Sequence, residues 1–228
     1  MRFLGLCVVL AACGPDGPAH RPPAELNGCS SSSLSPATTI TSLTERVNQL
    51  PPSEPSCLLA SLPRPIQLVA SSSITSAQPA TSPQSPRLFL IGAEVAISFV
   101  PDGDGAHLVE FGQWTSPTRT LKGELELPRA EAFALDAAFT RTRFSPSVSS
   151  CGLCHREEEA DAATGGSTSI AFRPLPQTLV PLTTLAREHE KCTRAEDRST
   201  RCVMFHALFD FGEVRSGAFD TDVALFGE

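Results

Sequence analysis

The sequence predicts an α+β protein, with a β-rich, sandwich-like domain over residues 37–145 and a small, mostly helical region over residues 146–228. The first part contains strand-like apolar runs separated by turn residues, and the second contains apolar residues at helical spacing. The 228 residues, 41% of them hydrophobic, can bury a core, while 20 prolines and 15 glycines favour short elements joined by many turns.

Short helices are expected before the strands of the first part. Apolar residues at spacings of three and four run over 38–50, where Pro51 follows, and Pro63 closes a second apolar segment over 57–62. The first strand is expected over residues 66–69.

Three further strand-like runs cover residues 88–100, 107–114 and 119–127. The sequence Pro101-Asp-Gly-Asp-Gly105 predicts a hairpin, because glycine readily adopts the positive φ that tight turns require. The last run alternates and predicts one buried and one polar face, with Leu121, Gly123, Leu125 and Leu127 on the first and Lys122, Glu124 and Glu126 on the second.

The second part is expected to be helical. Ser149 or Ser150 can cap a short helix over 151–163, because their hydroxyls can accept from the first backbone N–H groups. Helices are also expected over 182–192 and 196–211, the latter with a broad apolar side.

The N-terminus predicts export. Arg2 precedes ten apolar residues, which are too few to span a bilayer and are typical of a secretory signal peptide over residues 1–12. The segment over 13–36 is rich in proline, glycine and serine and predicts a flexible tether.

The end of this leader, Leu10-Ala-Ala-Cys13-Gly14, resembles the lipobox of bacterial lipoproteins. The resemblance implies that Cys13 is diacylated, becomes the new N-terminus and anchors the protein to a membrane. It also implies a location in the cell envelope, with Gly14 favouring the outer membrane, facing the periplasm or the cell surface.

Residues Cys151-Gly-Leu-Cys154-His155 form the CxxCH pattern of haem c attachment. Two thiols at this spacing can add to the two vinyl groups of haem, and the adjacent imidazole can bind the iron. Attachment of this kind needs an exported chain, which the leader supplies.

Residues 146–228 therefore resemble a bacterial c-type cytochrome region, with the pentapeptide as the specific part. The resemblance implies covalent haem c on Cys151 and Cys154, His155 as proximal ligand, and electron transfer with a redox partner protein. Met204 is a possible sixth ligand, although a methionine in an apolar helix is more often part of a core.

The other histidines are further candidates for the sixth position. His189 lies in a charged run, and His206 and His107 are more typical of packed or surface histidines. A five-coordinate iron is the remaining possibility, and an open position would permit ligand binding or peroxide chemistry.

Three alternatives use the same cysteines. One is a CxxC thiol-disulfide exchanger, and another is a zinc site formed by Cys151, Cys154, Cys192 and Cys202. The third is a surface lipoprotein whose β-rich domain binds a protein or glycan, with cysteines that form a structural disulfide or stay unmodified. Because the β-rich domain contains no recognisable catalytic set, an electron-transfer or binding protein is favoured over an enzyme.

Four cysteines remain for disulfides once the leader, the anchor and the CxxCH pair are set aside. The nearest neighbours along the chain are Cys29 with Cys57 and Cys192 with Cys202, although the sequence leaves the connectivity open. Eight cysteines in total favour an oxidising compartment.

The charge balance argues against a nucleic-acid partner. With 18 basic and 25 acidic residues, the formal net charge is −7, and no basic cluster interrupts it.

Overall fold

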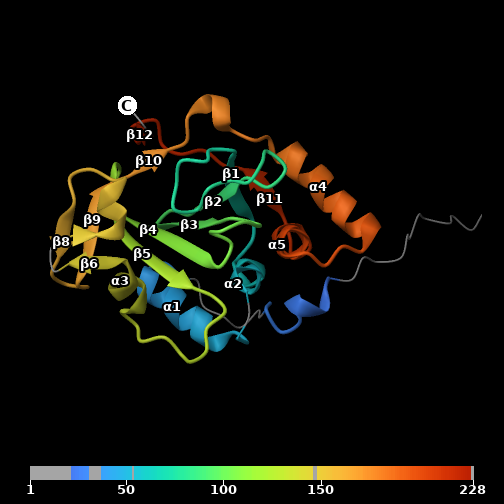
Figure 1. Ribbon diagram of the computed structural model, residues 1–228, viewed down its shortest axis with the longest axis horizontal. Helices are drawn as coiled ribbons and strands as arrows, with labels where there is room; N and C mark the ends of the chain where they lie inside the picture. The colour runs from blue at the N-terminus through green and yellow to red at the C-terminus, as the bar shows by residue number, and fades with distance from the viewer. Residues whose placement is uncertain (1–21, 31–36, 53, 146–147, 227–228) are drawn as a thin grey trace, which may run out of the picture.

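A mixed eight-stranded sheet forms the centre of the structure, a computed structural model that describes residues 22–30, 37–52, 54–145 and 148–226 (Figure 1). The strand order is β11-β1-β2-β3-β4-β5-β9-β8, and neighbouring strands are antiparallel except β1 and β11. The strands are β1 Ile66–Ser71, β2 Arg87–Ile91, β3 Val95–Phe99, β4 Leu108–Ser116, β5 Arg119–Glu126, β8 Glu159–Asp161, β9 Gly166–Ile170 and β11 Val214–Ser216. The α+β class is confirmed.

Five α-helices accompany the sheet: α1 Ile40–Gln49, α2 Pro55–Ser61, α3 Ala137–Thr142, α4 Leu182–Ala195 and α5 Thr200–Phe209. Helices α1, α4 and α5 form at the segments expected to be helical, and α2 covers most of the apolar segment over 57–62. The shorter elements are β6 Arg143–Ser145, β7 Val148–Ser149, β10 Phe172–Arg173, β12 Ala224–Leu225 and the 3-10 helices η1 Ala24–Leu26, η2 Ser150–Leu153 and η3 Pro176–Thr178.

One face of the sheet is apolar and packs against the helices. Leu90, Ile97 and Phe111 lie opposite one another on β2, β3 and β4 and are buried. Gly123 of β5 continues this row, and a Cβ added to it would lie 3.1 Å from Ile40 of α1. The absence of a side chain at Gly123 therefore lets α1 approach the sheet.

The other face of the sheet is polar and is nevertheless covered. Phe89, Ser98, Glu110 and Glu124 lie opposite one another across β2 to β5, and Lys122 of β5 is only 7% exposed. The alternation of the run over 119–127 is therefore confirmed. Its polar side, however, lies beneath a later part of the chain.

A sandwich was expected, and this expectation is wrong because the strands form one large sheet with helices on its apolar face. Two small sheets, β6 with β7 and β10 with β12, lie beside it. Strands β8, β9 and β11 come from the region expected to be mostly helical, so both parts of the chain contribute to the same sheet.

The run over 88–100 is two strands rather than one. Gly92 begins the turn between β2 and β3, and its N–H donates to the Val95 carbonyl at 3.1 Å. A Cβ on Gly92 would lie 2.6 Å from the Val95 oxygen, so the reversal depends on glycine there. The hairpin at residues 101–105 is confirmed, with Gly103 at a φ of +88°.

The length predicted for the helix over residues 151–163 is wrong, because the helix in the structure is much shorter. Ser149 caps it as predicted, since its hydroxyl accepts from the Cys151 N–H, but the helix is the single 3-10 turn η2. Glu157 then adopts a φ of +55°, which is incompatible with a continuing right-handed helix, and β8 follows.

The described part of the expected tether reaches into the core. Leu26 of η1 and Cys29 are buried, and Cys29 forms a disulfide with Cys57 of α2. The expected leader and Cys13 lie outside the described residues.

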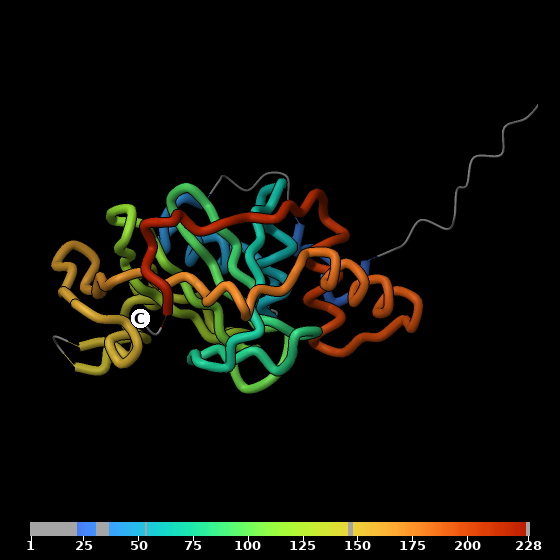
Figure 2. Tube along the Cα trace, turned by 90° about the horizontal axis from the view of Figure 1, so that it is seen from above, coloured from blue at the N-terminus to red at the C-terminus, as the bar shows by residue number. Residues whose placement is uncertain are grey.

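The C-terminal segment returns across the molecule after α5. Figure 2 shows it running back along the body to the end that contains β8 and β9. On the way β11 pairs with β1, and at its end β12 pairs with β10. Phe226 then packs edge-on against Phe172, with ring centroids 5.5 Å apart.

We expect the disulfide between Cys29 and Cys57 to contribute substantially to stability, because it closes a loop between residues 28 positions apart. The Cys29→Ala/Cys57→Ala variant should lose about 3.5 kcal/mol of unfolding free energy, and Cys192→Ala/Cys202→Ala, with a separation of 10, should lose about 2.7 kcal/mol. Urea denaturation of both variants and the wild type measures this. Equal stability of the first variant and the wild type would contradict the expectation.

Candidate functional site

The CxxCH segment is held in a tight loop before β8. Glu158 accepts hydrogen bonds from the Ser149 N–H and hydroxyl, both at 2.6 Å. The backbone N–H of His155 donates to the Cys151 carbonyl at 2.8 Å. A Cβ on Gly152 would lie 2.7 Å from a Glu158 carboxylate oxygen, so a larger residue there would require the Glu158 side chain to shift.

The His155 ring is fixed by one hydrogen bond and one stacking contact. Its Nδ1 lies 2.7 Å from the carbonyl oxygen of Ile170, at the end of β9. A separation this short requires a hydrogen between the two atoms, so Nδ1–H is the donor and Nε2 keeps its lone pair. The ring stacks on Phe172, with centroids 5.3 Å apart.

Lys122 lies next to this ring, with its Nζ 3.3 Å from His155 Nδ1. Burial, together with the Lys122 charge, lowers the pKa of His155 to about 3 despite the hydrogen bond to Ile170. Burial also lowers the pKa of Lys122 to about 8. His155 is therefore a neutral imidazole at neutral pH.

The Cys151 thiol lies in the same electrostatic environment. Burial, followed by the negative charge of Glu110, raises the pKa of Cys151 to about 11, although Lys122 opposes the shift. Cys154 is exposed, and neither cysteine is in a disulfide. The pair therefore presents two free thiols, one partly covered and one open to solvent.

Three adjoining cavities surround His155 and Phe172, with volumes of about 160, 100 and 410 Å³. Cys151 lines the first two, and Cys154 lines the first and third. The volume of the third lies in the range of small-molecule sites. The walls combine the rings of Phe89, Phe172 and Phe226 with the charged side chains of Arg87, Glu110 and Glu124.

The charged groups on the floor of these cavities are paired. Arg87 forms an ion pair with Glu110 and donates to the Ser98 hydroxyl at 2.9 Å. Its guanidinium also lies over the Phe89 ring, 4.7 Å from the centroid. These contacts fix the polar groups around an opening that is otherwise aromatic.

The structure brings Cys151, Cys154 and His155 together, but it places the candidate sixth ligands elsewhere. Met204 is 1% exposed in the core of α5. The described residues that line the three cavities include neither Met204 nor any of the three other candidate histidines. His189 and His206 lie together on α4 and α5, and His107 lies just before β4.

Sequence reasoning missed Lys122 and Phe172 as parts of the site. Lys122 was assigned to the polar side of its strand, but nothing in the alternation indicates that another segment covers that side. Phe172 lies 17 positions after His155, with no motif that connects the two.

The pairing of the remaining cysteines is confirmed for both nearest-neighbour pairs, Cys29–Cys57 and Cys192–Cys202. The four-cysteine zinc site is therefore wrong, because Cys192 and Cys202 are bonded to one another and have no thiolate to offer a metal.

Comparison with protein-family models, with curated proteins and with solved structures gives no match. Within the described parts of the chain, no helix has the length and apolar character needed to cross a bilayer.

We expect His155 to make the protein less stable as the pH falls. The folded-state pKa is below the unfolded value, so between pH 6.5 and about 3 the unfolded chain takes up a proton that the folded chain does not. One such proton reduces the unfolding free energy by at most about 1.4 kcal/mol per pH unit.

The His155→Gln variant tests this, because glutamine has an N–H donor for Ile170 but does not titrate. Urea denaturation between pH 4 and 7 should give a shallower pH dependence for the variant than for the wild type. Parallel curves would show that His155 is not buried as a neutral ring.

Proposed function

We propose that the protein is a lipid-anchored, extracytoplasmic c-type haem protein that takes part in electron transfer. The observation that carries this proposal is the hydrogen bond from His155 Nδ1 to the Ile170 carbonyl, within a CxxCH segment that has two unpaired thiols. Histidine ligands of metals commonly donate their other ring N–H to a carbonyl or carboxylate in this way.

The residues around His155 fit a covalently attached haem in three respects. The imidazole is neutral and keeps a lone pair on Nε2, which an iron ligand requires. Both thiols line the cavities next to this ring, and three phenylalanine rings contribute apolar walls. Together, the neutral imidazole, the two thiols and the phenylalanine rings suit a flat, largely apolar ligand that is covalently bonded along one edge.

Cys151 and Cys154 would hold the group through thioether bonds. Each thiol would add across one vinyl group, with the sulfur bonding to one carbon and the proton going to the other, so the step needs no external oxidant or reductant. When bound, haem supplies one-electron chemistry through its iron. His155 would bind that iron, and Phe172, which stacks on His155 and contacts Phe226, would shield the imidazole from water.

The alternative of a thiol-disulfide exchanger is less well supported by this environment. Exchange requires a thiolate, and catalytic cysteines of this class have a lowered pKa. The pKa of Cys151 is instead raised to about 11, and Glu110 adds to the effect of burial. The partly covered thiol is thus better suited to permanent modification than to repeated exchange.

We expect the mature chain, produced with a haem c maturation system, to give a covalent haem signal in a pyridine haemochrome assay. Cys151→Ala/Cys154→Ala should lose the signal because no thioether can form. Cys192→Ala/Cys202→Ala is the matched control, since it also removes two sulfur atoms but should keep the pigment. A colourless wild type, or pigment retained by the first variant, would overturn the proposal.

The membrane anchor is a separate part of the proposal and has its own test. When the gene is expressed in a bacterial host, mass spectrometry should find acyl chains on Cys13 and the protein should sediment with membranes. Cys13→Ser should abolish both, because serine has no thiol for lipid transfer. A wild type that carries no lipid and stays in the soluble fraction would contradict the anchor while leaving the haem proposal untouched.

A further inference from the structure

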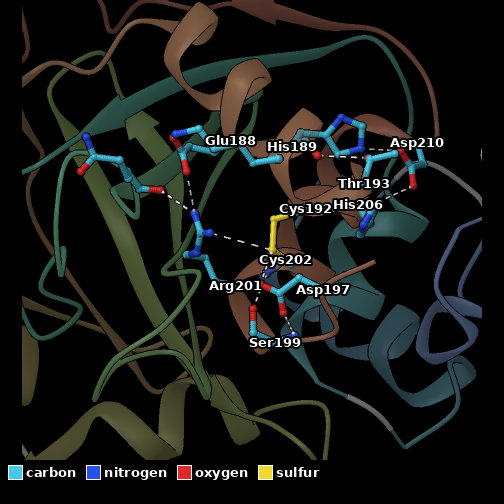
Figure 3. Close-up of a disulfide and its surroundings, with 12 residues drawn as sticks. Glu188, His189, Cys192, Thr193, Asp197, Ser199, Arg201, Cys202, His206 and Asp210 are labelled. Atoms are coloured by element: carbon cyan, nitrogen blue, oxygen red, sulfur yellow. Dashed lines mark hydrogen bonds and ion pairs between the residues drawn. A yellow bond between two sulfur atoms is a disulfide. The ribbon is translucent and has the colours of Figure 1, made fainter. Parts of the chain in front are cut away.

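A second group of side chains of a metal-binding type lies on α4 and α5. These side chains do not line the cavities around His155. His189 comes from α4, His206 from α5 and Asp210 from the C-terminal end of α5. Figure 3 shows both histidines linked to Asp210 from the two helices. The ring nitrogens and the carboxylate oxygen all lie within 4.8 Å of one another.

The contacts in this group are direct. His189 Nε2 lies 2.7 Å from one carboxylate oxygen of Asp210, and His206 Nδ1 lies 2.9 Å from the other. His206 and Asp210 are four positions apart, a spacing that places two ligands on one side of a helix turn. Asp210 thus bridges the two imidazoles.

The surroundings hold these donors in place. The disulfide Cys192–Cys202 joins α4 to α5, and Arg201 of α5 pairs with the buried Glu188 of α4 at 3.1 Å. His189 stacks on Phe209, with centroids 5.2 Å apart. Two helices that are cross-linked in this way cannot easily move apart, so the ligand positions are set before a metal arrives.

We propose that His189, His206 and Asp210 form a binding site for a divalent transition metal, with zinc as the best fit. Two imidazoles and one carboxylate are a common ligand set for zinc and non-haem iron, whereas calcium and magnesium prefer oxygen ligands alone. The metal would take the place of the hydrogens that lie between the Asp210 carboxylate and the two nitrogens His189 Nε2 and His206 Nδ1. Each imidazole would then carry its proton on its other nitrogen, Nδ1 of His189 and Nε2 of His206.

Metal binding requires the donor atoms to adjust, some apart and others closer together. Zinc bonds of about 2.0–2.2 Å in a tetrahedral arrangement place neighbouring donor atoms roughly 3.3–3.5 Å apart. The nitrogen–oxygen distances of 2.7 and 2.9 Å, which run to the two different oxygens of Asp210, need to lengthen by less than 1 Å. The wider separations in the group, which extend up to 4.8 Å, need to shorten.

The site has one accessible side. The side chains of His206 and Asp210 are 3% and 7% exposed, and that of His189 is 19% exposed. A metal would enter past His189, and with three protein ligands it would keep a coordination position for water or a small anion.

The test is zinc titration of the chelator-treated mature chain by isothermal calorimetry, performed in the Cys151→Ser/Cys154→Ser background. This background removes the thiols of the other candidate site, so the result does not depend on haem attachment. We expect one zinc ion per chain, and an increase in Tm with zinc that magnesium does not reproduce.

Two further variants in the same background test whether the zinc ion binds at these residues. His189→Gln changes the most exposed ligand, Asp210→Asn keeps the shape of the bridge, and each should weaken zinc binding at least tenfold. His107→Gln, which changes an exposed histidine elsewhere, should bind as the background does. Thermal unfolding without metal shows whether each variant is folded.

A spectrum of the cobalt-substituted background protein gives a readout that needs no ligand variant, because a tetrahedral nitrogen and oxygen site gives a visible absorption band. Absence of zinc binding and of this band, or equal binding by the folded His189→Gln and Asp210→Asn variants, would overturn the proposal. The three residues would then form only a hydrogen-bond network between α4 and α5.

Discussion

The hydrogen bond between His155 Nδ1 and the Ile170 carbonyl is the contact on which the arrangement of the candidate site depends. It connects the CxxCH loop to the end of β9, and it fixes which ring nitrogen carries the proton. The ring can then stack on Phe172 with its Nδ1 next to Lys122 Nζ. Without this bond a half-buried imidazole would be left with an unsatisfied donor, although the pairing of β8 with β9 would still hold the loop beside the sheet.

The covered polar face of the sheet is the second constraint. Burying charged side chains is costly unless they are paired, and here Arg87 and Glu110 neutralise one another while Lys122 lies within the influence of Glu110. Burial of these charged groups costs stability, and it places polar side chains at the bottom of a cavity that is otherwise lined by aromatic rings. Such a combination is typical of binding sites rather than of structural cores.

Most of the fold could be predicted from local sequence patterns, whereas the arrangement of the candidate site could not. Strands β1 to β5, helices α1, α2, α4 and α5, and both disulfide pairings follow from apolar spacing, proline stops and proximity along the chain. The division of 88–100 into two strands depends on a steric detail at Gly92, and the short η2 depends on the backbone at Glu157. The burial of Lys122 could not be predicted, because it results from contacts between segments far apart in the sequence, which periodicity within one strand does not report.

The late position of Phe226 has a consequence for the order of assembly. A chain emerges from its N-terminus, so the two CxxCH thiols become available about 70 residues before Phe226, which closes over Phe172. Until β12 has paired with β10, the cavities beside Cys154 lack the wall that Phe226 provides. The opening beside these thiols is therefore wider before the last residues fold into place than it is in the folded chain.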